Sequence, residues 1–226
     1  MLKIDIHKTF KTKQRITEIH CKAEIELGIA TAIYGKSGVG KSTVLRMIAG
    51  LETADTGTIT YNDTNWFNSD TKTNLKIAER NIGFVFQDFN LFPNMTVEGN
   101  LKYASNKVIS KDTMHLLEVT NLMQLLSSYP RELSGGEKQR VSIVRALCQN
   151  PKFLLLDEPF SALDDESIGD LIGEIKLIQK EIGTTVILVS HRKDVIFEMV
   201  DSVVHLQNGQ PVLQGKPHDL LKKTFG

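Results

Sequence analysis

Residues 35–42 follow the pattern G-x-x-x-x-G-K-S, whose residue types and spacing can hold a phosphate group. The preceding run 29–34 is short, apolar and partly β-branched, as in a buried strand. The following run 43–49 has a helical pattern, and Gly50 is placed to end that helix. This order predicts a phosphate-binding loop, formed by Gly35, Lys36, Ser37, Gly38, Val39, Gly40, Lys41, Ser42 and Thr43.

Each residue type in this loop has a physical reason to be there. The three glycines let the backbone bend so that its N–H groups point inward, and the helix N-terminus adds unpaired donors and partial positive charge. Lys41 can reach the β- and γ-phosphates of a nucleotide, and the Ser42 hydroxyl suits Mg²⁺. The alternative is an ordinary glycine-rich turn. Kinases, GTPases and ATPases share this loop, so it does not choose among them.

A second candidate site follows the apolar run 153–156, which reads as a buried strand that ends in two acids, Asp157 and Glu158. Beside a phosphate-binding loop, the first carboxylate commonly holds Mg²⁺ through its water shell. The second lies where it could align a water on the γ-phosphorus, so Glu158 is the candidate general base. The alternative is a pair of solvated acids at a strand end.

A third signal is the sequence LSGGE at 133–137, which has the features of a helix start. Ser134 is a suitable N-cap and Glu137 completes a capping box. An apolar face at helical period follows, made of Val141, Val144 and Leu147. However, Gly135 and Gly136 each cost the helix about 1 kcal/mol. A backbone that must contact a phosphate explains them, since a helix start favours anions.

Composition narrows the class of protein. A chain of 226 residues fits one large α/β domain, or a core with one sizeable insert. The 27 basic and 27 acidic residues balance, so charge recommends neither nucleic acid nor an anionic membrane as a partner. Cys21 and Cys148 have no metal-ligand spacing and suggest free thiols in a reducing compartment. With no signal pattern and no apolar run of membrane length, we expect a soluble, cytoplasmic chain.

The remaining pattern alternates strands with helices, which predicts a parallel sheet with a helical insert. We expect an antiparallel entry hairpin at 2–6 and 16–27 with a basic turn at 11–15. Further strands are expected at 58–61, 82–86, 184–189, 202–206 and 211–214, and an aperiodic loop at 65–76. Helices are expected at 97–103, 114–126, 137–147, 168–181, 193–199 and 219–223.

Taken together, the motifs at 35–42, 133–137, 157–158 and 161–164, with Gln87 and His191, resemble the ATP-binding cassette ATPases in order and spacing. The resemblance covers essentially the whole chain. It implies an α/β P-loop NTPase (RecA-like) core at about 1–89 and 149–226, with an antiparallel β subdomain and an inserted α-helical subdomain at about 90–148. It also implies ATP and Mg²⁺ as cofactors.

The resemblance assigns roles to single residues. Two chains would pair head to tail, and the turn Ser134, Gly135 and Gly136 of one would close over ATP held by the other. Gln87 would contact Mg²⁺ and the attacking water, Asp164 would cross the dimer seam, and His191 would contact the γ-phosphate. The aromatic residue that stacks on adenine would be Phe10; the equal alternative is that Phe10 packs inward from its strand.

The stretch 86–101 resembles the part of importer cassettes that faces a permease. There Phe89, Leu91, Phe92 and Met95 would form an apolar patch for a membrane permease subunit, unless they pack the core of the insert. The amino-acid sequence of 86–101 and 133–140 is most similar to that of ATPase subunits of molybdate-type oxyanion importers. Such a subunit works on the cytoplasmic face of the membrane and serves a solute-binding protein indirectly.

The solute stays open at this stage. Sulfate, other anions, amino acids and polyamines are alternatives to molybdate. Relatives often carry an oxyanion-binding C-terminal extension, and the sequence ends at Gly226 without one, so feedback by bound substrate is not expected. A soluble cassette acting on a ribosome or repair complex, an exporter cassette and a P-loop small-molecule kinase are the other classes. The interpretation as a kinase explains the phosphate loop but gives no role to residues 134–137 and His191.

Overall fold

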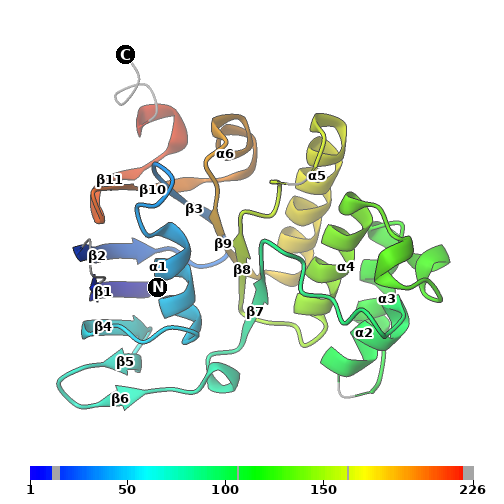
Figure 1. Ribbon diagram of the computed structural model, residues 1–226, viewed down its shortest axis with the longest axis horizontal. Helices are drawn as coiled ribbons and strands as arrows, with labels where there is room; N and C mark the ends of the chain where they lie inside the picture. The colour runs from blue at the N-terminus through cyan, green and yellow to red at the C-terminus, as the bar shows by residue number, and fades with distance from the viewer. Residues whose placement is uncertain (12–15, 106, 162, 221–226) are drawn as a thin grey trace.

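The computed structural model describes residues 1–11, 16–105, 107–161 and 163–220. The basic turn at 12–15, Ala162 and the end of the expected helix 219–223 lie outside them; residues 217–220 are helical. Two sheets organise the chain. A five-stranded sheet has the order β2-β1-β4-β5-β6, and a six-stranded sheet has the order β11-β10-β3-β9-β8-β7 (Figure 1).

The five-stranded sheet is antiparallel. Strands β1 (Leu2–Lys11) and β2 (Ile16–Ile25) form the predicted entry hairpin, and β4 (Thr56–Tyr61) pairs with the other edge of β1. The loop expected at 65–76 is wrong, because β5 (Thr64–Asn68) and β6 (Thr73–Asn74) extend this sheet. A register shift between Ile59 and Thr60 accompanies the burial of two consecutive residues, Trp66 and Phe67, so β5 lacks the alternation expected of a strand.

The six-stranded sheet is the predicted parallel sheet. Its parallel strands are β3 (Ala30–Tyr34), β7 (Ile82–Val85), β8 (Phe153–Asp157), β9 (Thr185–Val189) and β10 (Ser202–Gln207). Strand β11 (Gln210–Gly215) joins antiparallel at one edge through a turn at Asn208 and Gly209, both with positive φ. Every residue of β3, β8 and β9 is buried, as expected for strands covered on both faces.

The parallel sheet separates two hydrophobic cores. Alternate side chains of β8 enter different cores: Phe153 and Leu155 pack with helix α1 (Lys41–Ala49) and the antiparallel sheet. Leu154 and Leu156 pack on the opposite face with the other helices. Figure 1 shows α1 on one side of β7 and β8, and α4 and α5 on the other.

The second face is covered by α2 (Val97–Ala104), α3 (Lys111–Val119), α4 (Gly135–Leu147), α5 (Asp165–Ile182) and α6 (Lys193–Met199). Short 3₁₀ turns occur at Ile77–Glu79, Met123–Leu125 and Pro130–Glu132. The helix expected over 114–126 is wrong in extent. Helix α3 stops at Val119 because Asn121 is left-handed (φ 53°) and the Leu122 N–H turns back to the Leu117 carbonyl at 2.8 Å.

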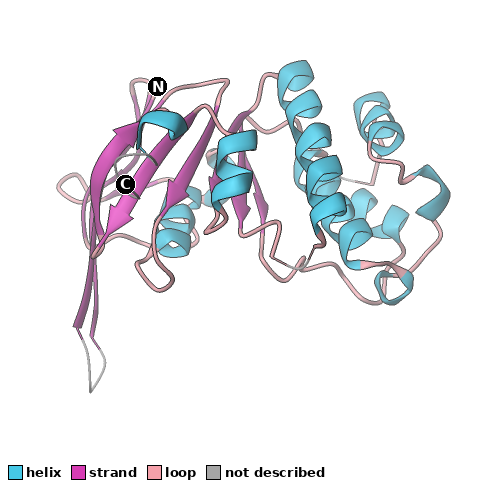
Figure 2. Ribbon diagram, turned by 90° about the horizontal axis from the view of Figure 1, so that it is seen from above, coloured by secondary structure: helices cyan, strands magenta, loops and turns pink. Residues whose placement is uncertain are grey.

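Figure 2, a view from above, shows the helices of 97–147 grouped at the end of the molecule away from β1 and β2. None of the helices in the described part of the chain has the length and apolar composition needed to cross a bilayer.

Candidate functional site

Four of the predicted motifs meet at one edge of the parallel sheet. The glycine-rich loop follows β3, Gln87 follows β7, Glu158 follows β8 and His191 follows β9. The carboxyl ends of neighbouring parallel strands lie at one edge, where α/β proteins bind ligands. A cavity of about 360 Å³ lies there; we call it the P-loop cavity, and it is lined by Ser37, Gly38, Gly40, Lys41, Ser42, Thr43, Gln87, Glu158, Ser161 and His191.

The loop has the backbone that its glycines predict. Gly38 and Gly40 have φ values of 76° and 102°, in the region that favours glycine. A Cβ on Gly40 would lie 2.5 Å from Ile19 Cδ1, and one on Gly35 would lie 2.4 Å from the Leu206 carbonyl oxygen. No side chain caps α1 at Gly40, so the start of the helix offers its N–H groups to an anion.

Lys41 is enclosed by its own loop. Its side-chain Nζ donates to the carbonyl oxygens of Gly35 at 3.0 Å and Lys36 at 3.2 Å, and the residue is only 7% exposed. Burial lowers the pKa of the Lys41 ammonium, and the nearby carboxylates of Glu158 and Asp157 oppose that shift. A cation held among carbonyl groups at the base of the loop can bind phosphate oxygens in their place.

The oxygen donors that suit Mg²⁺ are adjacent. Ser42 Oγ donates to Asp157 Oδ1 at 2.6 Å, and Asp157 is 1% exposed. The Arg46 guanidinium lies 3.6 Å from the other carboxylate oxygen. One hydroxyl and one carboxylate, with phosphate oxygens and water, match the hard oxygen ligands that Mg²⁺ takes at nucleotide sites. The residues therefore fit this ion.

Glu158 has a backbone that only a functional or well-supported residue adopts. Its φ is 50°, which is unfavourable for a side chain with a Cβ, and its N–H donates to the Val189 carbonyl at 3.0 Å. His191 Nδ1 lies 3.0 Å from one oxygen of the Glu158 carboxylate and 3.1 Å from the other. The Glu158 side chain is 14% exposed and that of His191 60% exposed, so the pair reaches from the protein interior to the cavity mouth.

The turn 134–136, which we call the signature turn, lies elsewhere on the chain. The Ser134 N–H donates to the Glu137 carboxylate at 2.7 Å and the Glu137 N–H donates to Ser134 Oγ at 3.3 Å, which confirms the predicted capping box. Ser134 is exposed and does not line the P-loop cavity. Helix α4, which it starts, packs on β7 and α2, whereas α1 packs on β8 and β9. The structure therefore does not bring this turn to the phosphate loop within one chain.

Of the three other predicted site residues, one lines the P-loop cavity and two lie outside it. Gln87 is exposed and lines the P-loop cavity. Asp164 is the N-cap of α5 and accepts from the Ser167 N–H at 2.8 Å and Oγ at 2.9 Å, which lowers the pKa of its carboxyl. Phe10 lies near the end of β1, is 37% exposed and has Lys8 Nζ 5.5 Å from its ring centre. Neither Asp164 nor Phe10 lines the P-loop cavity.

A cavity of about 970 Å³ on the other side of the loop shows residues that sequence reasoning missed. Glu18 of β2, His205 of β10 and the turn at Asn208 line it together with the phosphate loop and His191. The His205 ring packs on Tyr34 with ring centres 5.5 Å apart, and burial lowers the pKa of His205. In the sequence, the only signal for this cavity is the pair Asn208 and Gly209, which is typical of a turn. The turn lies beside the phosphate loop because β10 pairs with β3, and local sequence patterns do not predict that pairing.

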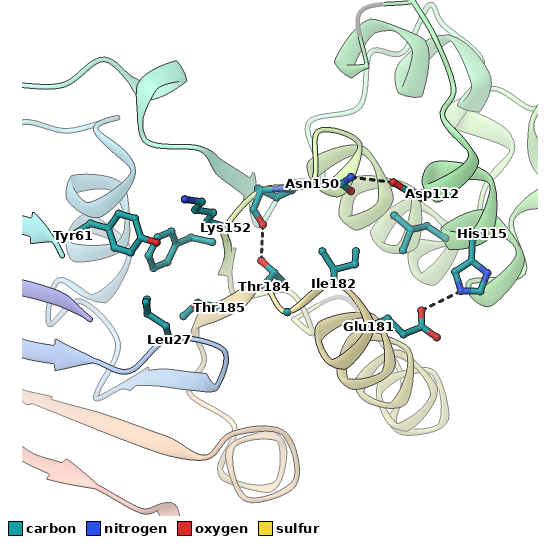
Figure 3. Close-up of a pocket in the computed structure, with 14 residues that line it drawn as sticks. Leu27, Tyr61, Asp112, His115, Asn150, Lys152, Glu181, Ile182, Thr184 and Thr185 are labelled. Carbon is teal, nitrogen blue, oxygen red and sulfur yellow. Dashed lines mark hydrogen bonds and ion pairs between the residues drawn. The ribbon is translucent and has the colours of Figure 1, made fainter. Parts of the chain in front are cut away.

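A third cavity, of about 810 Å³, lies at the opposite edge of the parallel strands (Figure 3). Its carboxylates already have partners: Glu181 lies 3.1 Å from His115 Nε2, and Asp112 accepts from Asn150 at 3.1 Å (Figure 3). None of the predicted site residues lines it. We therefore place the candidate nucleotide site at the carboxyl edge of the sheet.

A parallel sheet whose phosphate loop, paired acids and histidine line one edge defines a P-loop nucleotide-binding domain. The sequence profile of the ABC transporter family matches residues 20–161. The ATP-binding cassette MJ0796, solved as a dimer bound to ADP and Pi, superposes with a TM-score of 0.81 at 30% identity, over 96% of this chain and 99% of that one.

Two curated relatives agree with this match. The sulfate/thiosulfate import ATP-binding protein CysA of Mesostigma viride is 40% identical over 222 residues, which are 96% of this chain and 62% of that protein. The molybdenum import ATP-binding protein ModC of Haemophilus influenzae is 38% identical over 200 residues, which are 87% of this chain and 57% of that protein. The chain belongs to the ABC transporter family. It spans about three fifths of the length of these relatives.

Proposed function

We propose that this chain is the ATP-hydrolysing subunit of an ABC importer for molybdate or a related oxyanion. The observation that carries the ATPase proposal is the meeting of Lys41, Ser42, Glu158 and His191 around one cavity, with Asp157 bonded to Ser42 beneath it. The division into a nucleotide core at about 1–89 and 149–226 and a helical subdomain at about 90–148 belongs to the same proposal.

Phosphate binding would use groups that are already in place. The N–H groups at the start of α1 and the Lys41 ammonium would donate hydrogen bonds to oxygens of the β- and γ-phosphates of ATP. Ser42 and Asp157 would hold Mg²⁺, with Gln87 as a further ligand. When bound, that ion neutralises charge that develops on the phosphate oxygens.

Glu158 would position and deprotonate the attacking water. Its carboxylate lines the cavity beside Lys41 and is held by His191, so a water between the carboxylate and the γ-phosphorus would lose its proton to a Glu158 oxygen. His191, largely exposed, would contact the γ-phosphate and fix the direction of the Glu158 carboxylate.

The signature turn would complete the site from a second chain. Within one chain, residues 134–136 lie outside the P-loop cavity, and two chains in head-to-tail contact would bring each turn over the other's nucleotide. Asp164 would meet the same seam, and Phe10 or a neighbour on the hairpin would contact adenine. The relative MJ0796 is described as dimeric with ADP and Pi, which supports this arrangement.

The permease would bind the loop and helix at 86–101. Asn100 fixes this loop, because its side chain accepts from the Phe92 N–H at 2.8 Å and donates to the carbonyls of Phe92, Met95 and Thr96. The Phe92 ring packs against Tyr103, which is 65% exposed. Leu91, in contrast, packs against the core, so the surface offered to a partner is smaller than the full patch.

The solute is assigned by similarity alone. Relatives named for sulfate/thiosulfate and for molybdenum import are almost equally similar to the chain, which supports a tetrahedral oxyanion. Amino acids and polyamines are less supported alternatives, as is a soluble cassette without a transporter. The chain would sit on the cytoplasmic face of the membrane through its permease, and would meet a solute-binding protein only indirectly.

The first test is phosphate release from Mg-ATP by wild-type protein and by Glu158→Gln. The variant should bind ATP as tightly as wild type and hydrolyse it on the order of 10²–10⁴ times more slowly. Glu198→Gln, at an exposed acid on α6, is the control and should hydrolyse normally. Normal turnover by Glu158→Gln would remove the general-base role, and no turnover by wild type would remove the ATPase proposal.

A second test addresses the dimer and the partners. Ser134→Arg should block closure while ATP still binds the monomer, so turnover unaffected by it would contradict the head-to-tail arrangement. A tagged pull-down from solubilised membranes of the native host should recover a multi-span permease. Its solute-binding protein can then be titrated with molybdate and with sulfate by calorimetry. Recovery of ribosomal or nucleic-acid-linked partners alone would contradict the importer.

A further inference from the structure

The loop after Gln87 has an unusual backbone. Two consecutive residues, Phe89 and Asn90, are left-handed, with φ values of 58° and 49°. This conformation is unfavourable for residues other than glycine, and for a bulky residue such as Phe89 it is rare. Such a conformation persists only where the surroundings hold it.

Helix α4 holds this loop by its carbonyl groups. The Phe89 carbonyl oxygen accepts from Ser142 Oγ and from an Arg145 guanidinium nitrogen, the latter at 3.2 Å. The Asn90 carbonyl accepts from the other terminal nitrogen of Arg145 at 2.7 Å. The same guanidinium lies 5.7 Å from the centre of the Phe92 ring. Hydrogen bonds from a charged guanidinium are stronger than neutral ones, and a fork that holds two successive carbonyls fixes direction as well as distance.

The helix that carries this clamp begins at the signature turn. Ser134 caps α4, and Arg145 lies eleven residues further along the same helix, about 17 Å away. The buried face of the helix packs in the core of the helical region. Helix α4 therefore carries the signature turn at its start and, near its end, the clamp on the loop that follows Gln87, which lines the P-loop cavity.

We propose that Ser142 and Arg145 are positioning residues for Gln87: by holding the carbonyls of residues 89 and 90, they fix the path of the loop that places Gln87 at the P-loop cavity. The clamp acts on backbone carbonyls, so it does not depend on the side chains at 89 and 90. This inference rests on the proposed function, because Gln87 is taken to act on the ion and water of an ATPase.

A double-mutant cycle on ATP turnover tests the coupling. Arg145→Met removes the donors but keeps an apolar stem, and should lower turnover roughly tenfold while nucleotide affinity stays within about twofold. In the Gln87→Ala background the same change should cost less than about twofold, because the residue through which Arg145 acts is gone. Arg145→Lys keeps one cationic donor and should restore part of the activity. Lys102→Met, an exposed cation of α2 paired with Glu98, is the control and should match wild type.

An equal loss in both backgrounds would overturn the proposal, since a residue that only supports the fold gives additive effects. If Arg145→Met does not fold, Ser142→Ala removes a single hydroxyl and should show the same non-additivity. If wild type does not hydrolyse ATP, the proposed function fails, and the clamp is judged by hydrogen exchange. Amides of residues 87–92 should then exchange faster in Arg145→Met than in wild type, and unchanged exchange would overturn it.

Discussion

Replacement of Arg80 by Met is the sharpest test of the packing beneath the phosphate loop. Arg80 is 2% exposed, and burial lowers its pKa to about 10, which leaves it charged at neutral pH. Its guanidinium donates to the Met47 and Ile48 carbonyls at 2.9 and 2.8 Å, at the C-terminal end of α1. It also donates to the Leu75 and Trp66 carbonyls and to the Asn74 side chain, on the segment that extends the antiparallel sheet.

The expected loss follows from what remains after the substitution. Arg80→Met removes the donor to the Ile48 and Leu75 carbonyls, at about 1–3 kcal/mol each, whereas the Met47 and Trp66 carbonyls still accept from backbone N–H groups. It also removes a cation from the negative end of a helix dipole. The guanidinium is no longer dehydrated, which offsets part of that loss. The net destabilisation should be about 3–5 kcal/mol. For a chain of this length that lowers Tm by roughly 10 °C.

Urea unfolding followed by circular dichroism, with calorimetry for Tm, measures this loss. Arg80→Lys keeps the charge with fewer donors and should lie between wild type and Arg80→Met. Arg131→Met is the matched control, because this arginine is exposed and lies over the Tyr129 ring at 5.6 Å, so its loss should stay within about 0.5 kcal/mol. A loss below about 1 kcal/mol for Arg80→Met would refute the argument that these buried contacts hold α1 to the sheet.

Three further predictions follow from single positions. Gly50→Ala places a Cβ 2.9 Å from the guanidinium carbon of Arg80, at φ 80°, and should lower the free energy of unfolding in urea by more than about 2 kcal/mol. Gly183→Ala, at φ 71° with open space around it, should lower it by only about 1 kcal/mol. Gly173→Ala, in the exposed middle of α5 with nothing within 4 Å, should instead stabilise the protein by about 0.5–1 kcal/mol. Burial raises the pKa of the Cys21 thiol from 9.0 to about 12, so its contribution to stability is fully present below pH 9 and is lost as the pH rises towards 12. At pH 8 the native Cys21 thiol should not react with DTNB, and reaction without unfolding would contradict its burial.

Local patterns predicted the strand, glycine turn and helix around residues 35–43, because these three elements are contiguous in the chain. The meeting of Gln87, Glu158 and His191 was also predictable, since each follows a buried apolar run and parallel strands end at one edge. The features that sequence patterns did not predict depend on contacts between residues far apart in the chain. Strand β5 was missed because consecutive Trp66 and Phe67 are both buried. Arg80 was missed because its acceptors come from three segments that only folding brings together.

The capping residues show a different limit. A Ser, Asp or Asn beside a helix start can be recognised in sequence, and the structure shows both Ser134 and Asp164 as N-caps. Sequence does not say whether such a residue has a second role across an interface, because the hydrogen bonds of the cap are the same in either case. The role of Arg145 was also hidden, since it depends on the left-handed path of the loop it holds.

The enclosure of Lys41 has a consequence for how nucleotide affinity arises. Its ammonium is shielded from water and donates to the Gly35 and Lys36 carbonyls of its own loop. The free energy needed to dehydrate this cation is therefore part of folding and not of ligand binding. An entering phosphate has only to exchange with backbone acceptors in a loop that keeps its shape, which is preorganisation.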